Sequence, residues 1–184
     1  MISEAAVNSL DRLFRDNVSR HIRDLSAREC HLDIVVDETE MKEREFALIT
    51  LSSSVFKCLG IFHFNPAEKA RHWFGRLLST PLDRFDETAF RDAFLEFCNM
   101  CCGSLNRDLI AHFPHLGMST PYFLQRDCLP FIQELDPGFS RHYRIALEPD
   151  LILHVSLYLC DFGPVDFTAR YTDAVEDTGE LELF

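Results

Sequence analysis

Residues 85–113 read FDETAFRDAFLEFCNMCCGSLNRDLIAHF and predict one long amphipathic helix with a polar line along one side. At about 100° of rotation per residue, four side chains fall within a stripe about 60° wide. They are Asp92, Glu96, Asn99 and Gly103. The apolar residues lie on roughly the opposite side: Phe90, Phe94, Phe97, Cys98, Cys101 and Leu105. The pattern predicts a helix that buries one face and presents a carboxylate and a carboxamide, one turn apart, on the other.

The composition indicates a substantial core and an acidic surface. A chain of 184 residues is typical of one domain, or of one domain with an appendage. Hydrophobic residues make up 47%, and 17 Phe against a single Trp indicate a core filled largely by rings. The net charge of -12 argues against nucleic acid or an anionic membrane as the main partner, because both attract a basic surface.

The absence of a recognisable targeting signal, together with the cysteine usage, predicts a cytoplasmic protein. No stretch approaches the roughly 18 uninterrupted apolar residues of a membrane span. The N-terminus, MISEAAVNSLDRLFRD, is charged early and lacks the basic and apolar regions of a signal peptide. The 7 Cys are an odd number, scattered mostly inside apolar runs, which favours buried reduced thiols.

The order of predicted elements indicates an α+β domain. Helices are expected at 3–26, with Ser3 as N-cap, at 67–78 after the Asn65-Pro66 start, and at 85–113, capped by Asp83 or Asp86. Strands are expected at 30–36, 46–51, 55–64, 118–125, 142–148 and 151–161, and residues 127–140 are expected to be irregular. We predict one domain over residues 1–163, a mostly antiparallel sheet with long helices packed on one face, and an acidic C-terminal tail over residues 164–184.

Cysteine or histidine chemistry finds little support. Cys98 and Cys101 form a C-x-x-C, but they lie mid-helix on the apolar side, where no helix N-terminus lowers a thiol pKa. No second ligand pair completes a zinc site. No nucleophile elbow, G-x-G-x-x-G or P-loop is present. Core packing is the ordinary interpretation of these cysteines, and a redox protein remains an alternative.

The polar line is ordinarily explained as a solvated helix face, but Gly103 favours a second interpretation. A glycine in a helix interior costs roughly 1 kcal/mol relative to alanine, so it often marks the close approach of another group. Asn99, exposed in mid-helix, is also a mediocre helix former. We therefore expect this line to face a partner.

Residues 92–103, DAFLEFCNMCCG, resemble the signature helix of the CheC/CheX/FliY family of chemotaxis phosphatases, whose pattern is roughly D-x-x-x-E-x-x-N-x-x-x-G. The strand pair and Asn-Pro-started helix over 51–78 occupy the corresponding family positions, and MSTP at 118–121 resembles the family's strand-opening L-S-x-P. The final strand pair also fits, so the resemblance covers about residues 5–163. It implies a CheC/CheX-like α+β fold.

The resemblance also implies a function: hydrolysis of the aspartyl phosphate of a CheY-like response regulator. By residue match, Glu96 docks on the regulator by pairing with its active-site lysine, and Asn99 orients the attacking water. We expect Asp92 to lie at the edge of this contact and Gly103 to clear space for the partner's backbone. The regulator supplies Mg²⁺, so the resemblance implies no metal or other cofactor of the chain's own.

The pattern of motifs is that of a single-site member. The N-terminal helix carries DRLF and DNVS at 11–14 and 16–19 instead of a second E-x-x-N, which is closer to CheX than to CheC. CheX-like proteins dimerise by edge-strand pairing, so the resemblance implies a homodimer. The alternative to a phosphatase is a non-catalytic adaptor of the same fold that binds a receiver domain or another signalling protein.

Overall fold

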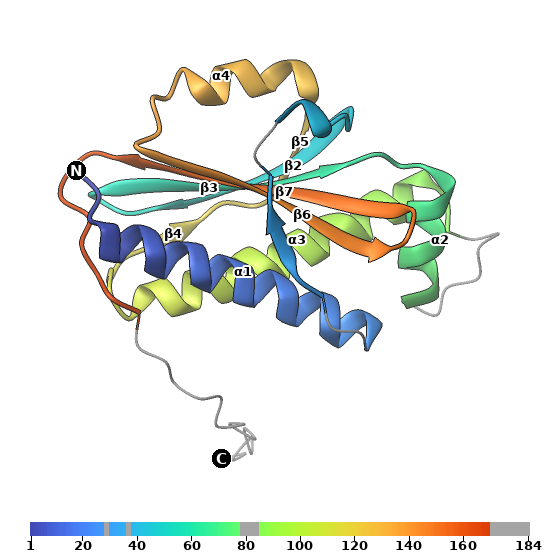
Figure 1. The fold of residues 1–184 in the computed structure, drawn as a ribbon, viewed down its shortest axis with the longest axis horizontal. Coiled ribbons are helices and arrows are strands. Elements are labelled where there is room, and N and C mark those ends of the chain that lie inside the picture. Colours follow the sequence, from blue (N-terminus) through green and yellow to red (C-terminus); the bar gives the residue numbers. More distant parts are fainter. Residues whose placement is uncertain (28–29, 36–37, 78–84, 170–184) are drawn as a thin grey trace, which may run out of the picture.

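The computed structural model describes residues 1–27, 30–35, 38–77 and 85–169. These residues form an antiparallel sheet of seven strands, with the two long helices α1 and α3 side by side on one face (Figure 1). The helices are α1 (Glu4–Ser26), α2 (Glu68–Leu77), α3 (Glu87–Ile110) and α4 (Leu129–Gln133), with single 3-10 turns at η1 (Glu38–Glu40) and η3 (Arg126–Cys128). The predicted α+β class, antiparallel sheet and helix-covered face are confirmed.

The strands follow the order β1-β6-β7-β3-β2-β4, and β5 also pairs with β2. Their bounds are β1 (Leu32–Ile34), β2 (Glu45–Ser52), β3 (Phe56–Phe64), β4 (Gly117–Met118), β5 (Tyr122–Gln125), β6 (Phe139–Glu148) and β7 (Leu151–Asp161). Each pair of neighbouring strands is antiparallel. Strands β3 and β7 are therefore central, and the most buried residues gather on them.

Side chains at the predicted caps start both long helices. The Oγ of Ser3 accepts a hydrogen bond from the backbone N–H of Ala6 at 3.0 Å, and the Oδ1 of Asp86 accepts one from Ala89 at 2.9 Å. These bonds satisfy donors that a helix start would otherwise leave unpaired. The expected caps Ser3 and Asp86 are confirmed, and the alternative Asp83 lies outside the described residues.

The core between the sheet and the two long helices is built from rings. Phe62 on β3 is fully buried, with its ring centroid 6.2 Å from that of Phe14 on α1 and 6.0 Å from that of Phe97 on α3. At Gly60 on the same strand, an added Cβ would lie 2.8 Å from the Sγ of Cys102. The missing side chain at Gly60 therefore lets α3 lie directly on the sheet.

The cysteines of α3 belong to this core. Cys98, Cys101 and Cys102 are each at most 1% exposed. Burial, together with the neighbouring thiols, raises the pKa of Cys98 and of Cys101 well above the usual value. The burial confirms that these cysteines pack in the core. A raised pKa disfavours the redox alternative, because the thiolate is the reactive form.

The segment 127–140, predicted to be irregular, contains a helix. The 3-10 turn η3 and helix α4 cover the sheet face opposite α1 and α3 (Figure 1). Ile132 of α4 packs against Phe46, Ile61 and Tyr158 in a second, smaller core. A five-residue helix carries too few turns for its apolar periodicity to stand out in the sequence, so its position depends on the sheet beneath it.

The strand predicted over 118–125 is two strands. Met118 of β4 pairs with Leu51, and the backbone N–H of Ser119 then bonds the carbonyl of Thr50 at 2.9 Å. The pairing with β2 resumes in β5 with Tyr122 opposite Leu48. Pro121 lies in the interruption, where its missing N–H breaks no ladder bond.

The C-terminal segment is described as far as Ala169. Val165 and Phe167 are buried, and the backbone N–H of Ala169 bonds the Oγ of Ser9 on α1 at 3.0 Å. Residues 164–169 thus pack on the domain. The rest of the predicted acidic tail, 170–184, lies outside the described residues, and the domain boundary stays a prediction.

A buried polar cluster lies on the α4 side of the sheet. The Oγ of Ser156 is 2.9 Å from the Nε2 of His63 and 2.8 Å from the Nδ1 of His142. The Nδ1 of His154 lies 2.6 Å from the Oε1 of Glu43. His63 and His154 are therefore buried histidines of the sheet, each with one ring nitrogen hydrogen-bonded, and the Nε2 of His154 is buried with no partner among the described residues.

His63 makes stability depend on pH. Burial, reinforced by the charges of His154, His142 and Arg126 and partly opposed by that of Glu43, lowers the pKa of His63 from 6.5 to about 4. Unfolding therefore takes up a proton between these pH values, so the stabilisation is complete above pH 6.5 and is lost as the pH falls toward 4. We expect the wild type to lose roughly 3 kcal/mol more than His63→Gln between pH 7 and pH 4, measured by urea unfolding. His72→Gln on the surface of α2 is the control, and equal losses in the wild type and His63→Gln would contradict the prediction.

Candidate functional site: the exposed line of α3

Helix α3 presents the predicted polar line to solvent. Asp92 and Glu96 are exposed, and Asn99 and Gly103 are partly exposed. The predicted apolar residues are all buried: Phe90, Phe94, Phe97, Cys98, Cys101 and Leu105. The 3.6-residue period of the sequence therefore places Glu96 and Asn99 one turn apart on the outer side of the helix, as predicted.

Contacts with α1 hold one flank of α3. The Nε2 of His21 lies 2.9 Å from the Oγ of Ser104, and the Nδ2 of Asn17 donates to the Oδ2 of Asp108 at 2.7 Å. Both bonds join residues far apart in the chain. They fix the rotation of α3 about its own axis, and with it the direction in which the polar line faces.

Contacts with the sheet edge hold the other flank. Arg91 donates to both carboxylate oxygens of Glu45 on β2, at 2.8 and 2.9 Å, and its guanidinium lies 5.3 Å from the ring centroid of Phe123 on β5. A second ion pair, with Glu87, forms within the helix. The polar line therefore lies on a helix anchored on both sides, the kind of rigid element that can present side chains to a partner without reordering.

The side chains of the polar line make no such anchoring contacts. Among the described residues, no hydrogen bond or ion pair engages the side chain of Asp92, Glu96 or Asn99. Their neighbour Arg91, by contrast, is paired with two carboxylates. The structure thus leaves a carboxylate and a carboxamide available on a fixed helix surface.

The internal packing does not require a glycine at position 103. A Cβ added there would meet only the Cε of Met118, at 4.0 Å, which is ordinary contact. Met118 on β4 is exposed and borders the line at Gly103. The sequence could not place it there, because it belongs to a different element. No packing contact within the described chain accounts for Gly103, and its place in a partner contact stays a prediction.

We expect Gly103→Ala to leave the fold intact and to raise the free energy of unfolding by up to about 1 kcal/mol, because alanine is the better helix former and meets no clash. Urea unfolding followed by circular dichroism measures this. Gly60→Ala is the contrasting control, because its Cβ would collide with Cys102. Destabilisation by Gly103→Ala would show that the glycine serves internal packing.

Alternative sites in the described chain are few. No group of three or more His, Cys, Asp or Glu among these residues has the arrangement of a metal site. Within the same residues, no helix is long and apolar enough to cross a membrane.

Solved structures with similar folds include CheX from Vibrio vulnificus, with a TM-score of 0.62 at 13% identity over 82% of this chain and 98% of that one. A CheC-like protein from a Shewanella species has a TM-score of 0.58 at 13% identity, over 85% and 98% of the two chains. CheX from Borrelia burgdorferi, solved as a CheX–CheY–BeF3–Mg²⁺ complex, has a TM-score of 0.61 at 17% identity, over 81% and 96%. No protein-family model and no curated protein matches the sequence. The chain has the fold of the CheX and CheC-like chemotaxis proteins.

Proposed function

We propose that the chain is a phosphatase that hydrolyses the aspartyl phosphate of a CheY-like response regulator. The observation that carries the proposal is the placement of Glu96 and Asn99, side by side and unpartnered within the described residues, on the outer face of a helix anchored on both flanks. The fold adds support, because a protein of this fold has been solved in complex with CheY.

The amide of Asn99 has the chemistry for positioning water. Its carbonyl oxygen accepts a hydrogen bond from a water molecule without any change in protonation. Phosphoryl transfer needs an attacking oxygen in line with the leaving oxygen and neutralisation of the developing charge. In the proposed complex Asn99 holds the water in line, and the regulator's Mg²⁺ and lysine neutralise the phosphoryl oxygens. The chain therefore contributes geometry and no metal or nucleophile of its own.

Glu96 supplies the docking contact. Residues three apart on a helix project from the same side, about 5 to 6 Å from each other, so one partner surface can meet both. In the proposed complex the Glu96 carboxylate pairs with the regulator's active-site lysine, which directs Asn99 to the phosphoaspartate. Asp92 and Gly103 lie one turn further out at each end, where they border the same contact.

The direct test is phosphate release from a phosphorylated receiver domain. Receiver domains encoded in the same genome are phosphorylated in the presence of Mg²⁺, and the decay of the phosphorylated form is followed with and without this protein. We expect the protein to accelerate decay of at least one receiver by about tenfold or more. If a receiver binds but its phosphate lifetime stays unchanged, the non-catalytic adaptor is the correct function. If the protein neither binds nor dephosphorylates any of these receivers, the phosphatase and the adaptor are both refuted.

Three expectations stay predictions beside this proposal: the homodimer, the cytoplasmic location and the absence of a nucleic-acid partner. In the described chain, β1 forms one edge of the sheet, and β4 and β5, which both pair with β2, form the other. A second copy of the chain therefore has two edges with which its own edge strand can pair. The charge of -12 still argues against a polyanion as partner.

A further inference from the structure

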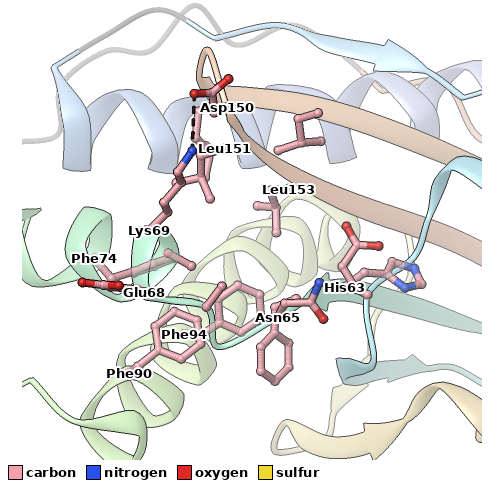
Figure 2. Close-up of a pocket in the computed structure, with 16 residues that line it drawn as sticks. His63, Asn65, Glu68, Lys69, Phe74, Phe90, Phe94, Asp150, Leu151 and Leu153 are labelled. Carbon is pink, nitrogen blue, oxygen red and sulfur yellow. Dashed lines mark hydrogen bonds and ion pairs between the residues drawn. The ribbon is translucent and has the colours of Figure 1, made fainter.

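The inner side of α3 offers little surface to a partner. A cavity of about 460 Å³ lies there, between α2, the turn that joins β6 to β7 and the first turns of α3 (Figure 2). The rings of Phe74, Phe90 and Phe94, which Figure 2 shows beside it, are at most 4% exposed. These rings pack against one another, so it is the outer side of α3 that a partner can meet.

Met118 of β4 places an apolar side chain next to the polar line on that outer side. It is 36% exposed, and its Cε lies 4.0 Å from the position that a Cβ at Gly103 would take. Gly103 is one turn beyond Asn99, about 6 Å along the axis and about 40° around it. An exposed methionine from another element therefore lies about one turn from the amide that is proposed to hold the attacking water.

Backbone hydrogen bonds hold Met118 in this position. It pairs with Leu51, which is fully buried on β2. The next residue, Ser119, donates its N–H to the carbonyl of Thr50 at 2.9 Å, and its Oγ accepts from the N–H of Thr50 at 3.0 Å. A side chain on a fixed backbone loses less entropy when a partner covers it, so this methionine is prepared for contact.

Neither feature at this point serves the described fold. A glycine in a helix interior costs roughly 1 kcal/mol relative to alanine, and a Cβ at Gly103 would meet only ordinary contact. Met118, in the part of the chain that the structure describes, belongs to neither of the two apolar cores. The missing side chain at Gly103 leaves a recess beside Met118, and a methionine thioether adapts to the shape of an apolar group placed against it.

The size of a protein contact extends it from Glu96 and Asn99 to this recess. A stable interface covers about 800 Å² on each partner, far more than two side chains provide. A partner that covers Asn99 therefore also covers Gly103 and Met118. Met is enriched at the centres of such interfaces, where charged residues are depleted. The line thus has an acidic end, Asp92 and Glu96, which suits a lysine, and an apolar end at Met118.

We propose that Met118 and the recess at Gly103 form an apolar anchor for the receiver domain, and that they bind an aliphatic or aromatic side chain which the receiver presents beside its phosphorylation site. The inference rests on the proposed function, because it takes the partner of Glu96 and Asn99 to be a receiver. In this arrangement Glu96 orients the receiver, Asn99 acts on the phosphoryl group, and Met118 supplies affinity.

The test separates binding from hydrolysis. Affinity is measured by calorimetry with a receiver that carries Mg²⁺ and beryllium trifluoride, which takes the place of the phosphoryl group and is not hydrolysed. We expect Met118→Ala to bind this receiver about tenfold more weakly and to raise KM for the phosphorylated receiver about tenfold, with kcat unchanged because Asn99 remains. Met118→Gln, which keeps the length but is polar, should show the same loss. Met118→Leu should stay within about twofold of the wild type, because it restores an apolar side chain of similar volume.

Ile152→Ala is the matched control. Ile152 is 37% exposed on β7, and its neighbour Leu153 belongs to the core under the long helices, so Ile152 faces the other side of the sheet. It should leave affinity and KM unchanged. Urea unfolding shows which variants are folded, and Met118→Gln decides the question if Met118→Ala is not.

The outcomes distinguish the anchor from the phosphatase. Wild-type affinity in a folded Met118→Ala or Met118→Gln protein, or a Met118→Leu protein as weak as Met118→Ala, overturns the anchor and leaves the phosphatase standing. A receiver that binds the wild type without being hydrolysed, and binds Met118→Ala more weakly, refutes the phosphatase and supports the anchor. If no receiver binds the wild type, both are overturned.

Discussion

Asn99→Ala is expected to lower the rate at which this protein accelerates receiver dephosphorylation by about 100-fold or more, the scale on which removal of one positioned hydrogen-bonding group acts in a closed site. The amide is the only group proposed to hold the attacking water, and alanine offers no replacement acceptor. The measurement is phosphate release from the phosphorylated receiver under saturating conditions.

Binding should separate this effect from simple unfolding or lost docking. Asn99 is partly exposed and makes no hydrogen bond within the described chain, so Asn99→Ala should unfold at the same urea concentration as the wild type. Its affinity for the receiver should change by only a few-fold, because Glu96 remains. Asn8→Ala, at an exposed position of α1, is the matched control and should keep full activity. An active Asn99→Ala protein would remove the proposed role of this residue.

Phe62→Ala is expected to lower the free energy of unfolding by about 3 to 5 kcal/mol, the range measured for buried phenylalanines. Phe62 is fully buried on the central strand β3, and its ring contacts Phe14 of α1 and Phe97 of α3. Its loss leaves a cavity where the sheet meets both long helices. Since a domain is stable by only about 5 to 15 kcal/mol, one such change removes a large part of its stability. Urea unfolding at pH 7 measures it.

The control is the same substitution at an exposed ring. Phe131 on α4 is 63% exposed, so Phe131→Ala should alter the free energy of unfolding by no more than about 0.5 kcal/mol. A small effect of Phe62→Ala would mean that the helices close the cavity by moving. In that case the orientation of α3, and with it the polar line, would be less firmly held than the structure indicates.

The α3 helix shows what can be derived from local sequence. Its apolar period, its cap at Asp86 and the stripe that contains Glu96 and Asn99 depend on residues a few positions apart, so they were predictable before any tertiary contact was known. The strand pairs β2–β3 and β6–β7 were predictable for the same reason, since short turns join them. The five-residue α4 and the division of β4 from β5 were not, because each depends on the strands it packs against.

The sequence by itself determined the amphipathic helix, predicted over 85–113 and found over Glu87–Ile110. It also determined the side of this helix that carries Glu96 and Asn99, and the burial of its cysteines. Only the tertiary structure decided which surfaces flank that helix, how the Glu43–His154 pair forms across 111 positions of the chain, and where a cavity remains between α2, α3 and the β6–β7 turn. The physical reason is range. Helical period and caps are set by neighbours within one or two turns, whereas ion pairs, buried histidines and cavities arise where distant segments meet, and no local pattern encodes that meeting.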